Sequence, residues 1–242
     1  MIYSILTTLF GFYDAIFQPL LAQGPYISLG VIAAGLAVIF SLLYWLFLDK
    51  EKRDEIKEKL DKQQEKMKEA QKDENKDASE HMKKTFELNR KFMMVNFKPS
   101  IATMVFVALL FPWLGATYAP AVELQQTGNN TGVFEGNFTY AQQNTPVVVD
   151  NTTGNVSIRI DGEEYSEGGA FHQHGIQWRI NNFKYQSGGL TSAEGYRLKV
   201  SAEYIQLPFS IPFAGTALNW LGFYIIILMP LSILFRKLLG VQ

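Results

Sequence analysis

The chain has 242 residues, a mean hydropathy near zero, a formal net charge of −1 at pH 7 and no cysteine. The near-zero mean hides opposite compositions, because long apolar blocks alternate with a block that holds 15 of the 22 Lys and Arg residues, between Asp49 and Pro99. The absence of cysteine excludes disulfides, thiolate metal sites and cysteine nucleophiles. Composition therefore favours a membrane scaffold over an enzyme, and domains must be counted by segment.

Residues 1–24 form an apolar segment with one polar stripe. The stripe consists of Ser4, Thr7, Thr8, Gly11, Asp14 and Gln18. Its period, close to 3.6 residues, predicts an amphipathic helix that lies in the outer membrane interface. A signal peptide is one alternative, but the segment lacks a positively charged beginning. A fourth span is the other alternative, and Asp14 and Pro19 count against it.

Three further blocks are long enough to cross a membrane as helices. They cover residues 26–48, 99–119 and 211–237. At a rise of about 1.5 Å per residue, a helix over the first block crosses a hydrocarbon core of about 30 Å. A buried helix of a soluble protein is the alternative for any one block, but three such runs favour a membrane α-helical protein with three spans.

The distribution of Lys and Arg beside these spans predicts their orientation. Cations flank the same side of all three spans: Lys50, Lys52, Arg53, Arg90, Lys91, Lys98, Arg236 and Lys237. Because cytoplasmic flanks carry an excess of Lys and Arg, this side is expected to be the cytosolic one. The prediction is an integral plasma-membrane protein with its N-terminus outside, residues 120–210 outside, and residues 49–98 and the tail at 238–242 in the cytosol.

Residues 49–98 are predicted to form a cytosolic antiparallel coiled-coil hairpin. A thin apolar seam with 4-3-4-3 spacing is expected along the first arm, at Ile56, Leu60, Gln63, Met67 and Ala70. The reversal is expected at residues 73–79, which lack apolar side chains at seam positions. The second arm carries apolar residues on one side, at Met82, Phe86, Met93 and Phe97.

Methionines are concentrated in this hairpin and at the start of the second span. Flexible thioether side chains suit surfaces that accept many apolar sequences. The candidate client-capture residues are Met82, Phe86, Met93 and Met94. Packing between the two arms explains Met82 equally well, so Met93 and Met94 are the better candidates.

Residues 120–210 are predicted to form an extracytoplasmic all-β domain, an antiparallel sheet or small sandwich, because short β-type runs alternate with turns rich in Asn and Gly. Four glycosylation sequons agree with an external location: Asn129, Asn137, Asn151 and Asn155. His172 and His174 would share a face of a strand and are weak candidates for a metal site. No catalytic triad order, P-loop or nucleotide fingerprint occurs in the sequence, so no enzymatic activity and no cofactor are expected.

Several local motifs occur in a characteristic order. They are Phe17–Leu21, Phe92–Pro99, Leu207–Gly215, Leu218–Tyr224 and Ser232–Leu239. Together with the three spans and the charged hairpin, they resemble the YidC/Oxa/Alb superfamily of membrane-protein insertases. The resemblance is greatest to its archaeal three-span members, kin to the third subunit of the ER membrane complex and the GET-pathway insertase. It covers about residues 1–117 and 207–240 and leaves the β domain outside.

The resemblance implies an insertase or chaperone that helps client helices to enter the membrane through a polar groove open to the cytosol. Polar residues at membrane depth are the candidate groove residues: Ser41, Tyr44, Asn96, Lys98, Ser100, Thr103, Asn219 and Tyr224. Hydrogen bonding between helices is the alternative role for such residues. Implied partners are nascent membrane proteins, the ribosome, membrane lipids and a partner membrane subunit, with no sequence-specific nucleic acid. A structural or receptor protein whose β domain binds a surface partner is the alternative function.

Overall fold

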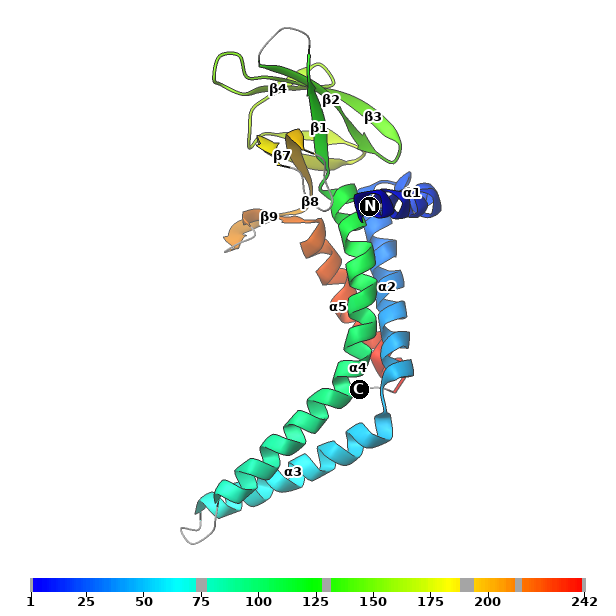
Figure 1. Cartoon of the computed structure of the whole chain (residues 1–242), viewed down its shortest axis with the longest axis vertical. Coiled ribbons are helices and arrows are strands. Elements are labelled where there is room, and N and C mark those ends of the chain that lie inside the picture. The colour runs from blue at the N-terminus through cyan, green and yellow to red at the C-terminus, as the bar shows by residue number, and fades with distance from the viewer. Residues whose placement is uncertain (1, 73–77, 128–131, 188–193, 212–214, 241–242) are drawn as a thin grey trace. The chain divides into compact units, whose positions relative to one another are not determined.

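The computed structural model describes residues 2–72, 78–127, 132–187, 194–211 and 215–240. The chain divides into two compact units: a first unit of Met1–Ala34 and Leu109–Leu228, and a second unit of Gly35–Ala108 and Met229–Gln242. The helices are α1 (Ile2–Leu21), α2 (Pro25–Phe47), α3 (Lys50–Lys72), α4 (Ala78–Tyr118) and α5 (Trp220–Leu238) (Figure 1).

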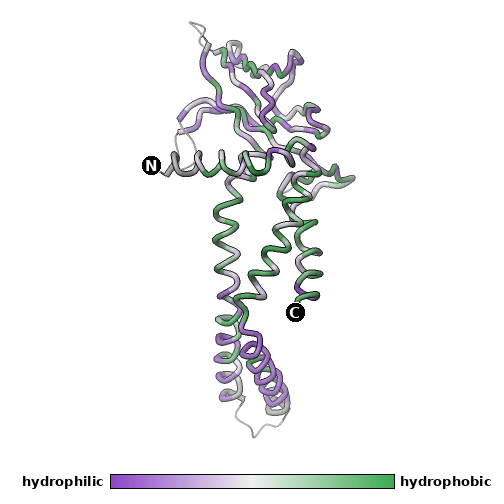
Figure 2. Tube along the Cα trace, turned by 90° about the vertical axis from the view of Figure 1, so that its right-hand side faces the viewer, coloured by the Kyte–Doolittle hydropathy of each residue, from purple (hydrophilic) through white to green (hydrophobic). Residues whose placement is uncertain are grey.

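Three of these helices are long and apolar enough to cross a membrane: α2, α4 from Met82 onward, and α5. Colouring by hydropathy shows α2 and α5 as mainly hydrophobic and α3 as hydrophilic (Figure 2). The last of these three helices, α5, starts at Trp220, later than residue 211, the start expected from hydropathy. The reason is local, because Asn219 Oδ1 accepts a hydrogen bond of 3.1 Å from the backbone N–H of Gly222 and so caps the helix.

The second arm of the charged segment and the second span form one helix. α4 continues through Pro99, which removes one backbone hydrogen bond to the carbonyl of Val95 without ending the helix. Lys98 is the last charged residue of α4, so residues 99–118 are free of charge. The expected boundary at residue 99 is therefore a change of composition within a continuous helix.

Within the second unit, α3 and α4 run side by side in opposite directions (Figures 1 and 2). The less exposed residues of α3 repeat at 3-4-3-4 spacing: Arg53, Ile56, Leu60, Gln63 and Met67. Ile56 packs in a cluster with Leu48 and Val95. Coiled-coil packing of the two arms stays a prediction. The reversal was expected at residues 73–79; residues 73–77 and the side chain of Ala70 lie outside the described parts, whereas Ala78 and Ser79 already belong to α4.

The apolar residues expected on one side of the second arm do share a side, but that side faces away from α3. Met82, Phe86, Met93 and Phe97 are all more than 60% exposed. The packed face of α4 is formed instead by Leu88, Phe92 and Val95. We call the four exposed residues the outer stripe of α4; at 100° per residue they lie within about 60° of one another.

The first unit contains a single antiparallel sheet of nine strands. The strands are β1 (Ala121–Gln126), β2 (Val133–Tyr140), β3 (Gln143–Asp150), β4 (Ser157–Ile160), β5 (Glu163–Tyr165), β6 (Ala170–Gln173), β7 (Ile176–Gln186), β8 (Gly195–Ile211) and β9 (Gly215–Asn219). Their order is β5-β4-β3-β2-β1-β8-β7-β6, with β9 paired to β8. The sheet therefore extends past residue 210, the boundary expected from the sequence.

The sandwich-like arrangement takes the form of one sheet that folds over on itself (Figure 1). Phe138 on β2 contacts Trp178 on β7, with ring centroids 4.9 Å apart, although two strands separate them in the sheet. Along β3, Val147 and Val149 are buried while Pro146 and Asn144 are exposed. This alternation follows from the two-residue period of a strand and directs one face of the sheet into the core.

Candidate functional site

The second unit contains a pocket of about 350 Å³ that combines cations with polar and apolar side chains. Helices α2, α3, α4 and α5 all contribute to it. Its lining consists of Tyr44, Arg53, Lys57, Phe92, Asn96, Ile233 and Arg236. We call it the basic pocket, because among the described residues that line it there are three cations and no carboxylate.

A hydrogen bond between two predicted groove residues borders the basic pocket. The Tyr44 hydroxyl donates to Asn96 Oδ1 over 2.9 Å. Asn96 Nδ2 in turn donates to the backbone carbonyl of Phe92 over 2.8 Å. Both ends of the Asn96 amide are therefore bonded, which fixes its orientation beside the pocket.

The cations of the pocket are held in different ways. Arg53 is only 8% exposed, and its guanidinium forms an ion pair of 2.8 Å with Asp54. The Arg236 guanidinium lies over the ring of Tyr44, 4.4 Å from the centroid. Its buried Nε atom has no hydrogen-bond partner within the described ranges. A cation–π contact orients a guanidinium without occupying its N–H donors, so those of Arg236 are available to an anionic or polar ligand.

This arrangement can lower the cost of bringing a polar or acidic group to the edge of the bilayer. A charged group at the centre of a bilayer costs about 3 kcal/mol on insertion scales. Hydrogen bonds from guanidinium donors to a carboxylate are stronger than neutral ones. Phe92 and Ile233 provide apolar surface beside these donors. The pocket therefore offers both charged donors and apolar surface to an amphipathic ligand.

Three other predicted groove residues lie on α4, in the same unit but outside the basic pocket. Lys98 lines a separate cavity. The Ser100 hydroxyl donates to the carbonyl of Asn96 over 3.0 Å, and the Thr103 hydroxyl donates to that of Ser100 over 2.9 Å. Such bonds to the preceding turn satisfy hydroxyl groups inside an apolar helix.

The remaining predicted groove residues have packing or capping contacts. Ser41 is fully buried and donates to the carbonyl of Ala37 over 2.7 Å, with the carbonyl of Ser232 at 3.5 Å. Asn219 belongs to the first unit and caps α5. Tyr224, also in the first unit, is 2% exposed and packs edge-on against Phe111, with centroids 5.3 Å apart.

The candidate client-capture residues are all on the surface of α4. Met82, Phe86, Met93 and Met94 are 63%, 73%, 71% and 67% exposed. They precede Lys98, where the charge-free part of the helix begins. Exposed apolar residues in such a row are typical of a surface that binds apolar partners.

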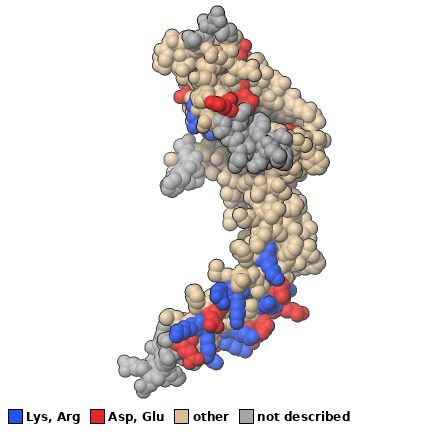
Figure 3. Space-filling model, in the orientation of Figure 1, with Lys and Arg blue, Asp and Glu red and all other residues tan. Residues whose placement is uncertain are grey.

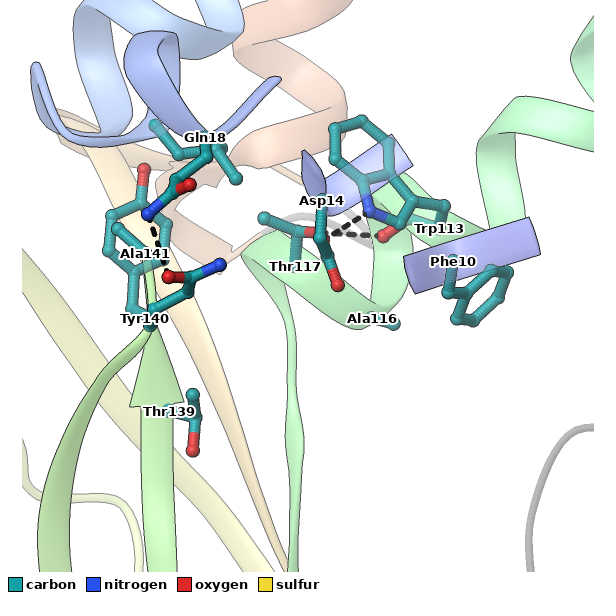
Figure 4. A pocket seen from close by; sticks show the side chains of 11 residues that line it. Phe10, Asp14, Gln18, Trp113, Ala116, Thr117, Thr139, Tyr140 and Ala141 are labelled. Carbon is teal, nitrogen blue, oxygen red and sulfur yellow. Dashed lines mark hydrogen bonds between the residues drawn. The ribbon is translucent and has the colours of Figure 1, made fainter. Parts of the chain in front are cut away.

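A polar pocket of about 170 Å³ in the first unit explains the polar stripe of α1. The Asp14 carboxylate accepts a hydrogen bond of 2.8 Å from Trp113 Nε1, and Gln18 Nε2 donates to the Gln142 side chain over 2.7 Å (Figure 4). On the other side of α1, Phe12 and Ile16 are more than half exposed. Two residues of the stripe, Asp14 and Gln18, thus contact protein, and an apolar side of α1 faces outward.

The two histidines proposed as weak metal ligands do not share a face of a strand. His172 lies on β6, whereas His174 lies in the turn after it, with a positive φ of 55°. Within the described ranges no group of three or more His, Asp and Glu residues is placed to hold a metal ion. Burial lowers the pKa of His174 below its ordinary value. Its ring packs against Tyr140, with centroids 5.2 Å apart.

The sequons differ in how far the structure describes them. Asn137 lies on β2, and Asn151 and Asn155 lie between β3 and β4; all three are exposed. Asn129 lies outside the described residues. Glycosylation of the exposed three stays a prediction.

Sequence reasoning missed the cations of the basic pocket. From the sequence, Arg53 and Arg236 were expected only as flanking charges that set orientation, and Lys57 was not singled out. A signal existed in the i, i+4 spacing of Arg53 and Lys57, which places both on one face of α3. Arg236 comes close to these two residues only because of the way α5 packs, and the sequence alone does not predict that packing.

Comparison with known proteins yields one match. Residues 14–138, just over half of the chain, match the model of a family described as integral membrane protein EMC3/TMCO1-like. The matched region runs from α1 through α4 to β2, while most of the sheet and α5 lie beyond it. Searches among curated proteins and among solved structures found no significant match.

Proposed function

The chain belongs to the EMC3/TMCO1-like family of integral membrane proteins, within the Oxa1/YidC-related insertase superfamily, and on this premise we propose that it inserts client helices into the membrane. The basic pocket receives the polar or acidic flank of a client helix. The apolar stretch of the client then partitions into lipid without a nucleotide or a cofactor. We further assign it to the archaeal three-span type.

The observation that carries this proposal is the Arg236 guanidinium, whose donors are available to a ligand beside apolar surface in the basic pocket. Arg236 is oriented by the Tyr44 ring and retains donors for a ligand. Tyr44 and Asn96 form a fixed polar edge. A pocket that served only to pack four helices would not require a half-buried arginine with no carboxylate among the described lining residues, since burying an unpaired charge is costly.

The outer stripe supplies the first contact with a client in this proposal. Its four residues are exposed and offer two flexible thioethers and two aromatic rings. Such side chains adapt to different apolar sequences, because thioethers have several low-energy conformations and contact aromatic rings favourably. A nascent helix would bind the stripe and then move along α4 toward the membrane. The ribosome and a partner membrane subunit are further proposed contacts of the hairpin.

The orientation that we propose for the protein in the membrane follows from the distribution of Lys and Arg residues. Lys and Arg side chains gather over α3 and the neighbouring part of α4, among Asp and Glu side chains (Figure 3). From the excess of cations beside the spans we propose that the hairpin and residues 238–242 lie in the cytosol, with α1 and the sheet outside a plasma membrane. The basic pocket then opens on the side where clients are synthesised.

Photocrosslinking during translation tests the proposal. Photoreactive residues are placed at Met93, at Met94 and, as a control, at Tyr185, which is exposed on β7. The client is a membrane protein with a single helix and a short translocated tail. The expected result is a client adduct at the two methionine positions and none at Tyr185.

The alternative function predicts a different result. A receptor whose sheet binds a surface partner would give no client adduct on α4, and its adducts would form on the sheet with a protein that is not being synthesised. That outcome would overturn the insertase proposal.

A further inference from the structure

A second cavity in the second unit, of about 400 Å³, combines three lysines with apolar side chains. Lys52 comes from α3, and Lys91 and Lys98 come from α4. Ile56, Met94 and Phe97 contribute apolar surface. We call this cavity the lysine pocket. Among the predicted groove residues it includes only Lys98.

The lysines of the lysine pocket lack the ion pairs that lysines farther along α3 form. There, Lys59 pairs with Glu55, and Lys62 pairs with Glu58 at 2.7 Å. Over the described ranges, no ion pair within 4.0 Å joins Lys52, Lys91 or Lys98 to a carboxylate. The one carboxylate that lines the pocket, Asp49, accepts a hydrogen bond of 3.1 Å from the backbone N–H of Lys52.

The position of the pocket along the helices indicates what it meets. α2 carries no charge up to its end at Phe47, and α4 carries none after Lys98. The pocket therefore lies where the charge-free parts of two membrane-spanning helices meet the charged hairpin. When those parts occupy the hydrocarbon core, this level coincides with the phospholipid headgroups.

Apolar residues continue from the pocket toward the charge-free part of α4. At 100° per residue, Met94, Ile101 and Val105 lie within about 40° of one another on the helix. They are 67%, 49% and 54% exposed. A ligand with an anionic head and a long apolar chain would place its head among the lysines and its chain along these residues.

We propose that the lysine pocket binds an anionic phospholipid, with the phosphate held by Lys52, Lys91 and Lys98. Lysine ammonium groups act as point charges for phosphate, and basic pockets beside membrane-spanning helices bind acidic headgroups. Charge complementarity favours this occupant over a zwitterionic lipid. The apolar path along α4 favours a lipid over a free phosphate ion, which has no chain to bury.

Lipid retention by the full-length protein tests this inference. The protein is purified in detergent, mixed with equal amounts of phosphatidylglycerol and phosphatidylcholine of the same chain length, and examined by native mass spectrometry. The test variant carries Lys91→Gln and Lys98→Gln. The matched control carries Lys59→Gln and Lys84→Gln, which remove two cations of the same hairpin at exposed ion pairs.

The expected result is preferential retention of phosphatidylglycerol by the wild type and the control. In the test variant, the apparent affinity should fall roughly thirtyfold, the loss expected for two lysines near a membrane surface. Equal retention of both lipids by the wild type would overturn the inference, as would equal losses in the test variant and the control.

Two competitors identify the occupant. Inorganic phosphate at millimolar concentration and a soluble peptide with a carboxylate terminus are each added to the lipid-loaded protein. Retention of the lipid against both supports the inference. Displacement by phosphate would show a simple anion site, and displacement by the peptide would show a client site; either would overturn it. A circular dichroism melt of each variant verifies that it is folded.

Discussion

The Tyr44 hydroxyl donates a hydrogen bond to Oδ1 of Asn96 over 2.9 Å, which joins α2 to α4 at the edge of the basic pocket. The same tyrosine supplies the ring on which the Arg236 guanidinium lies. One side chain therefore orients an amide through its hydroxyl and a cation through its ring.

These two roles can be separated by substitution. Tyr44→Phe should destabilise the protein by about 1 kcal/mol, because it removes the hydrogen bond but keeps the ring. Tyr44→Leu should cost more, since the cation–π contact is lost as well. Denaturant unfolding in detergent measures both. Equal losses would show that the ring does not hold Arg236.

The second prediction concerns the charge of the basic pocket. Arg236→Gln should reduce insertion of a client with an acidic flank about tenfold, since a hydrogen bond to a charged group contributes roughly 1.5–3 kcal/mol. Insertion of a client with an uncharged flank should change little. The measurement is the fraction of client protected from protease after reconstitution into vesicles.

Lys237→Gln provides the matched control for that experiment. Lys237 is the next residue and is exposed, and the basic pocket is not lined by it. Both substitutions remove one cation from the same flank, so they change the orienting charge equally. A similar defect in both variants would attribute the effect to orientation rather than to the pocket.

The third prediction concerns the contact between α1 and α4. Asp14→Leu should destabilise the protein by about 1–3 kcal/mol, because the indole N–H of the buried Trp113 loses its acceptor. Asp14→Asn keeps an acceptor oxygen and should cost less. Hydrogen exchange of the α1 backbone should rise in Asp14→Leu. Unchanged exchange would mean that the aromatic stack of Phe17 on Trp113, with centroids 5.1 Å apart, holds α1 alone.

The fourth prediction is a pH dependence of the sheet. Burial lowers the pKa of His174 from its ordinary value of 6.5, so the unfolded chain takes up a proton at a pH where the folded chain does not. Stability is then complete above about pH 6.5 and falls as the pH decreases below it. The melting temperature should decrease between pH 7.5 and 5.5, and less so in His174→Asn, which tolerates the positive φ. An identical decrease in melting temperature in the wild type and in His174→Asn would contradict the assignment of this pH dependence to His174.

Hydropathy and charge were sufficient to predict the three helices that are long and apolar enough to cross a membrane, because an uncharged run of about 20 residues has few other stable placements. They were not sufficient to choose the packed face of α4. Leu88, Phe92 and Val95 form one apolar row, and Met82, Phe86 and Met93 form another. Periodicity identifies both rows, but only the position of α3 decides which row is buried.

The candidate site was predicted in part for a related reason. Tyr44 and Asn96 were expected in a groove and do lie together beside the basic pocket. Asn219 was expected there because a polar residue near an apolar run indicates a functional group. Its actual contact is a helix cap, and the start of α5 had to be known to within one residue to recognise it.

The continuity of α4 from Ala78 to Tyr118 fixes a rotational phase between its two parts. Inserting one residue before Phe92 would turn the N-terminal part of the outer stripe by about 100° about the helix axis, relative to Phe97 and Ile101 in the C-terminal part of the helix. Inserting seven would turn it by only about 20°. The arm can therefore lengthen or shorten in steps of about seven residues and keep its exposed row aligned with the exposed apolar residues beyond Pro99, whereas single-residue changes break that alignment.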